Sequence, residues 1–234
     1  MVDSSTKRDL CPAFWQELSG KIAPDSLIFD LGTHHLEEAE LLVPHLERAE
    51  WHGFEPNFEC YRYSTEHVAT RLMASHACSI VVTCAAVGRA RGDIDFYLSS
   101  KKSGESWTPS SSTRKPKNAL VYYPWMDFKE VVRVPVMTLD EYAEEHGLCE
   151  RSVGLVKMDI QGAEIDAVLG GQGLLSRTKL LVVEVVEGEE YEGQVGLQGL
   201  LDALPGRWEI VERLVSDALL VNLTPSVYSR RSSG

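Results

Sequence analysis

Short apolar runs and longer amphipathic stretches alternate along most of the chain. The first apolar run, Leu27–Leu31, is interrupted by Asp30 and ends at Gly32. Thr33, a capping-type residue, follows, and a helical spacing of apolar residues begins at Leu36. This order predicts a buried strand that leads through a tight glycine turn into a helix. In open α/β sheets such a turn lies at the carboxyl edge of the strands, where ligands bind.

The same alternation continues to residue 223 and predicts an α/β fold. Further strands are expected at residues 51–56, 79–86, 92–98, 131–137, 153–159, 180–186, 208–214 and 218–223, and helices at residues 11–18, 36–46, 57–74, 138–146, 164–170 and 197–204. Pro44 is expected to kink or end the second of these helices. Because helices alternate with strands until a final hairpin, the order predicts a three-layer αβα sandwich with a mostly parallel sheet and an antiparallel last strand.

Residues 99–118 depart from both patterns. They are rich in serine and basic residues, include Trp107 and show no regular apolar spacing. A long segment of this kind is usually a functional lid or a disordered loop. As a lid it would bring Ser106 and Trp107 against a substrate, and its five basic residues would attract an anionic one; the alternative is a solvated loop. The expected organisation is an N-terminal helical extension at 1–25, one domain at 26–223 with a lid inserted at about 99–130, and a flexible tail at 224–234.

Composition and charge argue against several classes of protein. The 234 residues include 35 acidic and 23 basic ones, and this net charge of −12 argues against general binding to nucleic acid or anionic membranes. The five cysteines are scattered without a CxxC pair, so neither a disulfide framework nor a structural zinc site is expected. No apolar run approaches the roughly 18 residues of a membrane helix, and residues 1–9 lack the apolar centre of a signal peptide. A cytoplasmic protein is therefore expected.

Four acidic residues each stand at the end of a predicted strand: Asp30, Glu55, Asp159 and Glu184. Because parallel strands end at one edge of a sheet, these carboxylates are expected to converge on one crevice. Acidic residues are also common in loops, but four such positions favour a functional cleft. Asp159 and Glu184 are candidates for holding a divalent cation, yet no third ligand is evident, so no metal is expected.

The charge of this cleft favours one kind of ligand over another. The helix after the glycine turn opens with Glu37, Glu38 and Glu40, which would repel a pyrophosphate. The dinucleotide fingerprint GxGxxG is absent, since the next glycine after Gly32 is Gly53. A nicotinamide oxidoreductase is therefore the weaker hypothesis. A positively charged nucleoside such as S-adenosyl-L-methionine fits better, and Glu55 is placed to accept hydrogen bonds from both ribose hydroxyls.

Five sequence blocks, in order, resemble the FkbM-type S-adenosylmethionine-dependent methyltransferases of class I. They are Phe-Asp-Leu-Gly-Thr-His at 29–34, Gly-Phe-Glu-Pro-Asn at 53–57, Cys-Ala-Ala-Val-Gly at 84–88, Thr-Leu-Asp at 138–140 and Leu-Val-Lys-Met-Asp-Ile-Gln-Gly-Ala-Glu at 155–164. The last block is the most specific. The resemblance covers about residues 26 to 186 and implies a Rossmann-like methyltransferase with a seven-stranded sheet.

The resemblance also implies roles for individual residues. Cofactor-binding positions would be Asp30, Gly32, Thr33, Glu55, Pro56, Phe58, Cys84, Ala85, Asp159 and Gly162. Among these, Asp30 and Gly32 would form the turn on the methionine side, and Glu55 would hold the ribose. Asp159 would lie beside the sulfonium and the acceptor, where Trp107, Ser106 and Glu184 are the candidate contacts. Glu164 has two open interpretations, a cap of the following helix or a direct role.

The chain departs from the family pattern at Leu36, where a second glycine is usual, and at His34, where Asn is common. A side chain at position 36 would crowd the cofactor or shift the turn, so a degenerate binding or scaffold protein is an alternative hypothesis. His34 and His35 are candidates for a general base on an acceptor hydroxyl, or fill polar positions in the turn.

The expected activity is methyl transfer to an oxygen of a small molecule such as a sugar or natural product, with nitrogen as the second choice of acceptor atom. The expected partner is this small-molecule acceptor, with no nucleic acid and no membrane. The identity of the acceptor stays open, and so does the oligomeric state, for which a homodimer is one option.

Overall fold

The computed structural model describes residues 10–186 and 188–225. Seven strands form one sheet in the order β3-β2-β1-β7-β8-β10-β9. Their bounds are β1 Leu27–Leu31, β2 Ala49–Phe54, β3 Cys78–Thr83, β7 Val153–Met158, β8 Thr178–Glu184, β9 Trp208–Arg213 and β10 Asp217–Asn222. Strands β1, β2, β3, β7 and β8 pair in parallel, while β10 runs antiparallel to both β8 and β9. The predicted mostly parallel, seven-stranded sheet with an antiparallel last strand is confirmed.

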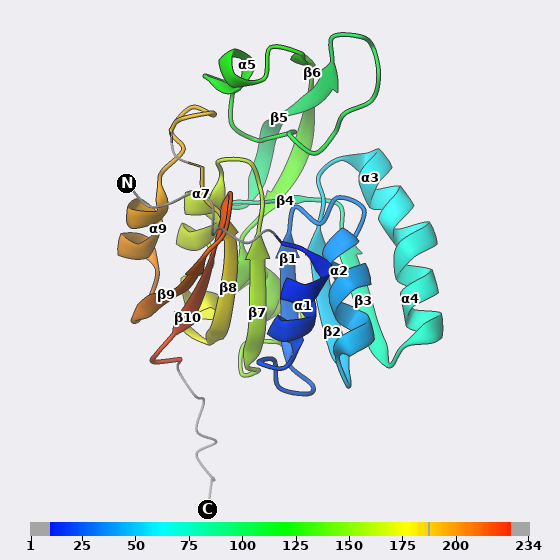
Figure 1. Cartoon of the computed structure of the whole chain (residues 1–234), viewed down its shortest axis with the longest axis vertical. Coiled ribbons are helices and arrows are strands. Elements are labelled where there is room, and N and C mark those ends of the chain that lie inside the picture. The colour runs from blue at the N-terminus through cyan, green and yellow to red at the C-terminus, as the bar shows by residue number, and fades with distance from the viewer. Residues whose placement is uncertain (1–9, 187, 226–234) are drawn as a thin grey trace, which may run out of the picture.

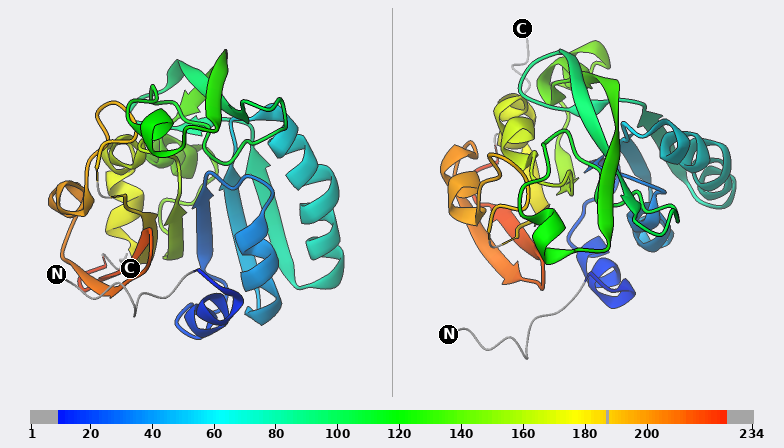
Figure 2. Two further views of the ribbon diagram at one scale, coloured as in Figure 1. Left: turned by 45° about the horizontal axis from the view of Figure 1, so that its top comes forward. Right: turned by 90° about the horizontal axis from the view of Figure 1, so that it is seen from above.

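Helices cover both faces of this sheet and make the three layers (Figures 1 and 2). Their bounds are α1 Pro12–Ser19, α2 Glu37–Leu42, α3 Phe58–Tyr63, α4 Thr70–Ser75, α6 Leu139–Glu145, α7 Glu164–Leu169, α8 Gln172–Ser176 and α9 Leu197–Ala203. The alternation of side chains along a strand explains the two cores. In β1, Phe29 packs with α6 to α9 on one face, and Ile28 packs with α1, α2 and α4 on the other.

Local signals in the sequence set several helix boundaries. Helix α2 ends at Leu42 and passes into a 3₁₀ turn, Val43–His45, because Pro44 has no N–H to continue the α-helix. The side chain of Asn57 caps α3 and that of Thr138 caps α6. The long helix expected at 57–74 is present as α3, a π-helical turn at Ser64–Ala69 and α4.

A second, three-stranded sheet stands above the carboxyl edge of the main sheet (Figure 1). It has the order β4-β6-β5, with bounds β4 Ala86–Val87, β5 Gly92–Lys101 and β6 Met126–Met137. Strands β5 and β6 pair antiparallel from Gly92 opposite Val136 to Lys101 opposite Met126. Residues 99–101 and 126–130 are therefore strand, which corrects the expectation of an irregular lid over 99–130. The segment that remains, 102–125, contains one short helix, α5 Ala119–Tyr122.

Two expectations fall on the ends of the chain. Residues 1–9 of the N-terminal extension and 226–234 of the tail lie outside the described residues. Within the described ranges, every helix is too short or too polar to cross a lipid bilayer.

Candidate functional site

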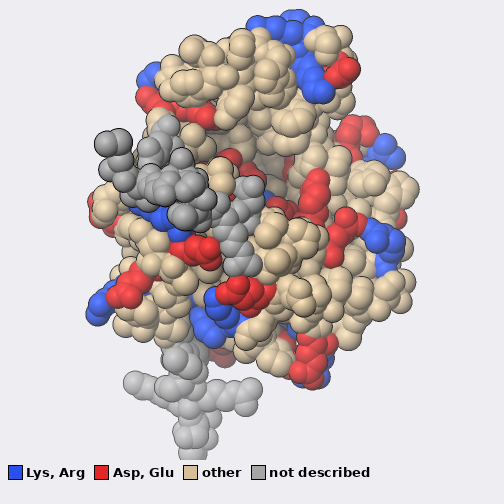
Figure 3. Space-filling model, in the orientation of Figure 1, with Lys and Arg blue, Asp and Glu red and all other residues tan. Residues whose placement is uncertain are grey.

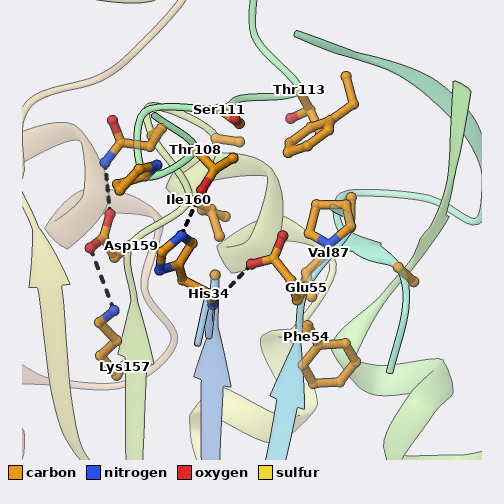
Figure 4. A pocket seen from close by; sticks show the side chains of 18 of the residues that line it. His34, Phe54, Glu55, Val87, Thr108, Ser111, Thr113, Lys157, Asp159 and Ile160 are labelled. Atoms are coloured by element: carbon orange, nitrogen blue, oxygen red, sulfur yellow. Dashed lines mark hydrogen bonds and ion pairs between the residues drawn. The ribbon is translucent and has the colours of Figure 1, made fainter. Parts of the chain in front are cut away.

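A cavity of about 270 Å³ lies at the carboxyl edge of the main sheet, beneath the second sheet and segment 102–125. Figure 3 shows acidic side chains inside the hollow below the upper part of the molecule, and Figure 4 shows the cavity from close by. The ends of three neighbouring strands contribute Gly32, Glu55 and Asp159 to its wall. Segment 102–125 contributes Thr108 and Ser111 from above. Of the four acidic residues predicted at strand ends, Glu55 and Asp159 therefore line this cavity, and Asp30 lies just below it.

The turn after β1 requires glycine at position 32. Gly32 has a φ of +78°, and a Cβ there would lie 1.9 Å from the carbonyl oxygen of Asp159. The N–H groups of Gly32 and Thr33 donate to the Phe54 carbonyl at 3.0 and 3.1 Å, which fastens the turn to β2. This turn and the end of β7 are in direct contact, so the backbone of Gly32 forms part of the cavity wall.

Glu55 is held rigidly at the end of β2. Its two carboxylate oxygens accept hydrogen bonds from the backbone N–H groups of His34, at 2.9 Å, and Asn57, at 2.7 Å. Burial raises the pKa of Glu55 to about 7, although these backbone hydrogen bonds act in the opposite direction. The side chain is almost completely buried yet lines the cavity, so its remaining lone pairs face the ligand space.

A buried lysine lies among three carboxylates at the base of the cavity. Lys157 of β7 has its Nζ 3.3 Å from Glu38, 3.4 Å from Asp159 and 3.9 Å from Asp30. Burial by itself lowers the pKa of Lys157, but the three carboxylates outweigh it and raise that pKa well above its usual value. Burial raises the pKa of Asp30 to about 7, against the attraction of Lys157. Asp30 is fully buried and supports the cavity from below without lining it.

His34 connects the glycine turn to the segment above it. One ring nitrogen lies 2.8 Å from a Glu37 oxygen and the other 2.8 Å from the Thr108 hydroxyl. Both ring nitrogens of His34 are thus engaged, one with a carboxylate and the other with a hydroxyl. His35 does not line the cavity; its ring lies 3.9 Å from that of His34 and 4.7 Å from that of Tyr63. These contacts of His34 hold the turn, and the role of either histidine as a general base stays a prediction.

The other predicted cofactor residues divide into two groups. Pro56 and Ala85 line the cavity. Thr33, Phe58, Cys84 and Gly162 do not line it, which corrects their expected placement. Thr33 is fully buried and its hydroxyl donates to Asp30, whereas Phe58 is 61% exposed on the outer side of α3. Cys84 lies beside Ala85 but outside the wall, and Gly162, with a φ of +93°, faces Tyr191.

Leu36 does not obstruct the cavity. Its backbone adopts the left-handed conformation with a φ of +64°, the region that favours the glycine of the family pattern. Its side chain does not line the cavity and is completely buried in the core that α1, α2 and α4 cover. The departure at position 36 therefore strains the turn locally but leaves the ligand space open.

A second cavity of about 600 Å³ adjoins the first and shares Pro109, Asp159 and Gln161 with it. Trp107 and Glu184 line this second cavity, whereas Ser106 is exposed and lines neither. The Gln161 side-chain amide donates to Asp159 and to Glu184, both at 2.8 Å. Burial, together with the charge of Asp159, raises the pKa of Glu184 well above its usual value. The side-chain amide of Gln161 thus holds the carboxyl groups of Asp159 and Glu184 together where the two cavities meet.

Glu164 caps the turn that follows β7. Its Oε1 accepts hydrogen bonds from the backbone N–H groups of Ile160 at 3.1 Å and Gly162 at 3.2 Å. The residue is buried and lines neither of the two cavities. Of the two interpretations of Glu164, the geometry supports the cap.

Among the described residues, three potential metal-ligand atoms come within 4.8 Å of one another at His34, His35 and Cys60. The imidazole planes of the two histidines are tilted by 34° to each other. Both ring nitrogens of His34 already have partners in Glu37 and Thr108, so we assign no metal to this group.

The pattern of strand ends does not single out Lys157, Thr108 or Gln161, whose side chains contact the predicted site residues. Lys157 carries the clearest signal, a lysine inside the otherwise apolar strand β7. The backbone of Gln161 also has a positive φ of +54°, which sequence alone does not reveal.

Comparison with known proteins adds a family and a fold. The family model described as the methyltransferase FkbM domain matches residues 30–213. The 2-O-methyltransferase NoeI of Sinorhizobium fredii (strain NBRC 101917 / NGR234) is 32% identical over 152 residues, which cover 64% of this chain and 58% of NoeI. The chain thus spans somewhat more than half the length of that relative.

Two solved structures are also similar. The methyltransferase FkbM from Methylobacillus flagellatus KT matches with a TM-score of 0.52 and 15% identity, over 90% of this chain and 50% of that one. An rRNA methylase from Streptococcus thermophilus has a TM-score of 0.44 and 7% identity, over 90% of this chain and 96% of that one. The first of these shares the Rossmann-like sandwich described above.

Proposed function

The chain belongs to the FkbM methyltransferase family, and from this premise we propose that it transfers a methyl group from S-adenosylmethionine to a hydroxyl oxygen of a small-molecule acceptor. The observation that carries the proposal is the buried, doubly hydrogen-bonded Glu55 in an acid-lined cavity at the carboxyl edge of the sheet. The name of the relative NoeI, a 2-O-methyltransferase, supports oxygen as the atom methylated.

The residues of the first cavity fit this cofactor chemically. Glu37, Glu38, Glu55 and Asp159 line it, and the two basic residues of the wall, Lys157 and His34, are each already paired with carboxylates. This surplus of negative charge suits a sulfonium and an ammonium group and repels a pyrophosphate, which disfavours a nicotinamide oxidoreductase. The fixed oxygens of Glu55 suit a ribose diol, and an apolar wall of Pro56, Ala85, Val87 and Phe96 suits an adenine.

Asp159 is the residue best placed for proton removal. When bound, S-adenosylmethionine supplies an electrophilic methyl group whose transfer leaves a neutral thioether. The acceptor hydroxyl must lose its proton, and Asp159 lies where the two cavities meet, with its side chain 34% exposed. Gln161 and Lys157 hold its two oxygens in place. Alignment of the two reactants contributes up to about 7–11 kcal/mol in reactions of this kind.

Calorimetric titration tests the cofactor assignment. S-adenosylmethionine and its demethylated product should both bind and raise the melting temperature of the protein. In the Glu55→Gln variant the affinity for both should fall at least tenfold, because an amide offers an N–H₂ group in place of one acceptor oxygen. Glu144→Gln, on the exposed side of α6, is the matched control and should bind normally.

Two other results would overturn the proposal. Binding of NAD(H) without binding of S-adenosylmethionine would identify an oxidoreductase. No response to either would support the scaffold hypothesis.

A further inference from the structure

We propose that the second cavity is the acceptor site and that the acceptor is a carbohydrate that carries no negative charge. This inference rests on the proposed function and names the substrate class of the same site. Its starting point is the geometry of the junction, where Pro109, Asp159 and Gln161 face both cavities. A group seated in the second cavity therefore reaches Asp159 from the side opposite Glu55.

One wall of the second cavity is aromatic. Segment 102–125 supplies Trp107, Tyr123 and Trp125 to it. The ring of Trp125 lies 5.1 Å from that of Trp107 and 6.3 Å from that of Tyr123, in edge-to-face arrangements. Trp125 and Tyr123 are still 41% and 40% exposed, so part of their surface is available to a ligand. Aromatic faces of this kind bind the C–H face of a pyranose ring, which is flat and apolar.

The facing wall is acidic. It contains Glu184 at the end of β8, Glu190, and Asp217 at the start of β10. Within the described part of the chain, the neutral hydroxyls of Tyr123 and Ser216 lie 3.4 and 3.1 Å from Glu190 and Asp217, and no ion pair involves any of the three carboxyl groups.

An acceptor with hydroxyl groups can form hydrogen bonds to the carboxyl groups of this wall, whereas an apolar acceptor cannot. Covering carboxyl groups with an apolar ligand removes water without replacing its hydrogen bonds, which is costly. Sugar hydroxyls donate to carboxylates and restore those bonds. A ring with an apolar face and donors around its edge therefore matches an aromatic wall opposite an acidic one, and that description fits a saccharide.

The negative charge of the second cavity determines which acceptors it binds. Burial and, less strongly, the negative charge of Asp159 raise the pKa of Asp217 to about 6, so this carboxyl group is still mostly ionised at neutral pH. Arg213 is the single basic residue among the described residues of the lining. A phosphorylated sugar or a uronic acid would add to this repulsion. Neutral sugars and amino sugars would not.

The test is a titration of the protein saturated with S-adenosylhomocysteine. The probes are methyl gluco-, galacto- and mannopyranosides, each as the neutral glycoside, the 2-amino glycoside and the uronate. At least one neutral or amino glycoside should bind, and its uronate should bind at least tenfold more weakly. Trp125→Ala should weaken that binding at least fivefold and Trp125→Phe should restore part of it. Tyr122→Ala, exposed on α5 outside the cavity, is the matched control.

The acidic wall is tested separately in the double variant Glu190→Gln/Asp217→Asn. There the preference for the neutral glycoside over the uronate should fall to threefold or less, with cofactor affinity unchanged. A uronate that binds the unmodified protein as well as the neutral glycoside overturns the proposal. So does normal cofactor binding with no glycoside bound, a result that leaves the proposed function standing. If the cofactor itself fails to bind, the proposed function is wrong and the acceptor assignment falls with it.

Discussion

At the scale of single residues, one ammonium group, that of Lys157, is shared by three carboxylates. Lys157 lies between Asp30, Glu38 and Asp159 and is nearly inaccessible to solvent, so each carboxylate depends on the same ammonium group. Removing one partner of a buried charge pair typically costs about 3–5 kcal/mol, because the remaining charge is left unpaired.

We expect Lys157→Met to lose about that much free energy of unfolding at pH 7.5. The loss should shrink at pH 5.5, because the pKa of Asp30, already raised to about 7 by burial, rises further once the lysine is gone, and a protonated carboxyl needs no counter-charge. Urea unfolding at the two pH values measures this. An equal loss at both would show that packing, not charge, accounts for the effect.

Leu36→Gly should separate the effect of this residue on stability from its effect on cofactor binding. Removal of the fully buried side chain should destabilise the protein by about 2–5 kcal/mol, reduced by about 1–2 kcal/mol because glycine adopts the left-handed conformation without strain. Affinity for S-adenosylmethionine should stay within twofold, because the side chain does not line the cavity. Unfolding and titration experiments measure both. Tighter cofactor binding would contradict this placement.

Residues at strand ends were predictable, whereas contacts between distant segments were not. Glu55 and Asp159 follow from the position of an acid after a buried strand. The hydrogen bond of Thr108 to His34 joins residues 74 positions apart, and no local pattern encodes it. Phe58 illustrates the reverse error, since a residue next to a predicted site can still face solvent.

At the scale of secondary-structure elements, two helices with similar side-chain caps have different neighbours. Asn57 caps α3 beside the cavity, and its backbone N–H also holds Glu55. Thr138 caps α6, and its side chain accepts a hydrogen bond from the N–H of Glu141. The two caps therefore allow a matched comparison.

Asn57→Ala and Thr138→Ala should each lower the free energy of unfolding by about 1 kcal/mol, as the loss of a helix cap does. Cofactor affinity should fall only in the Asn57 variant, because a frayed start of α3 loosens the N–H that holds Glu55. Denaturant unfolding and calorimetric titration of both variants provide the measurements. Equal affinities in the two variants would show that Glu55 is held independently of the cap.

The main sheet was predictable from element order, but the second sheet was not. Strands β5 and β6 show the same alternation as a strand of any sheet, and their choice of each other over the main sheet depends on long-range pairing. The polar residues 99–101 also continue β5 although they lack an apolar pattern, because the antiparallel partner β6 extends beside them.

At the scale of the whole molecule, several buried carboxyl groups make the folded protein less stable at high pH. The pKa values of Asp30, Glu55 and Glu164 are each raised to about 7 by burial, above their values of 3.8 and 4.5 in exposed chains. A raised pKa means that the folded state binds protons more tightly than the unfolded state. The corresponding stability is complete at low pH and is lost as the pH rises through 7.

The ligand-free protein should therefore melt at a lower temperature at pH 8 than at pH 6. Each proton released contributes up to about 1.4 kcal/mol per pH unit, and each kcal/mol corresponds to about 2–4 °C in a protein of this size. Differential scanning calorimetry across this range measures the slope, and Glu55→Gln should make it shallower. A melting temperature that rises from pH 6 to pH 8 would contradict these pKa shifts.

Gly32 and the carbonyl oxygen of Asp159 are packed so closely that no side chain fits between the turn after β1 and the end of β7. During divergence, or in a redesigned variant, this part of the wall cannot be remodelled without separating the two central strands. Space for a larger acceptor has to come from residues 102–125 or from the β9–β10 hairpin. If the first cavity binds the nucleoside as proposed, acceptor preference is free to change over evolutionary time while that half of the site stays constant.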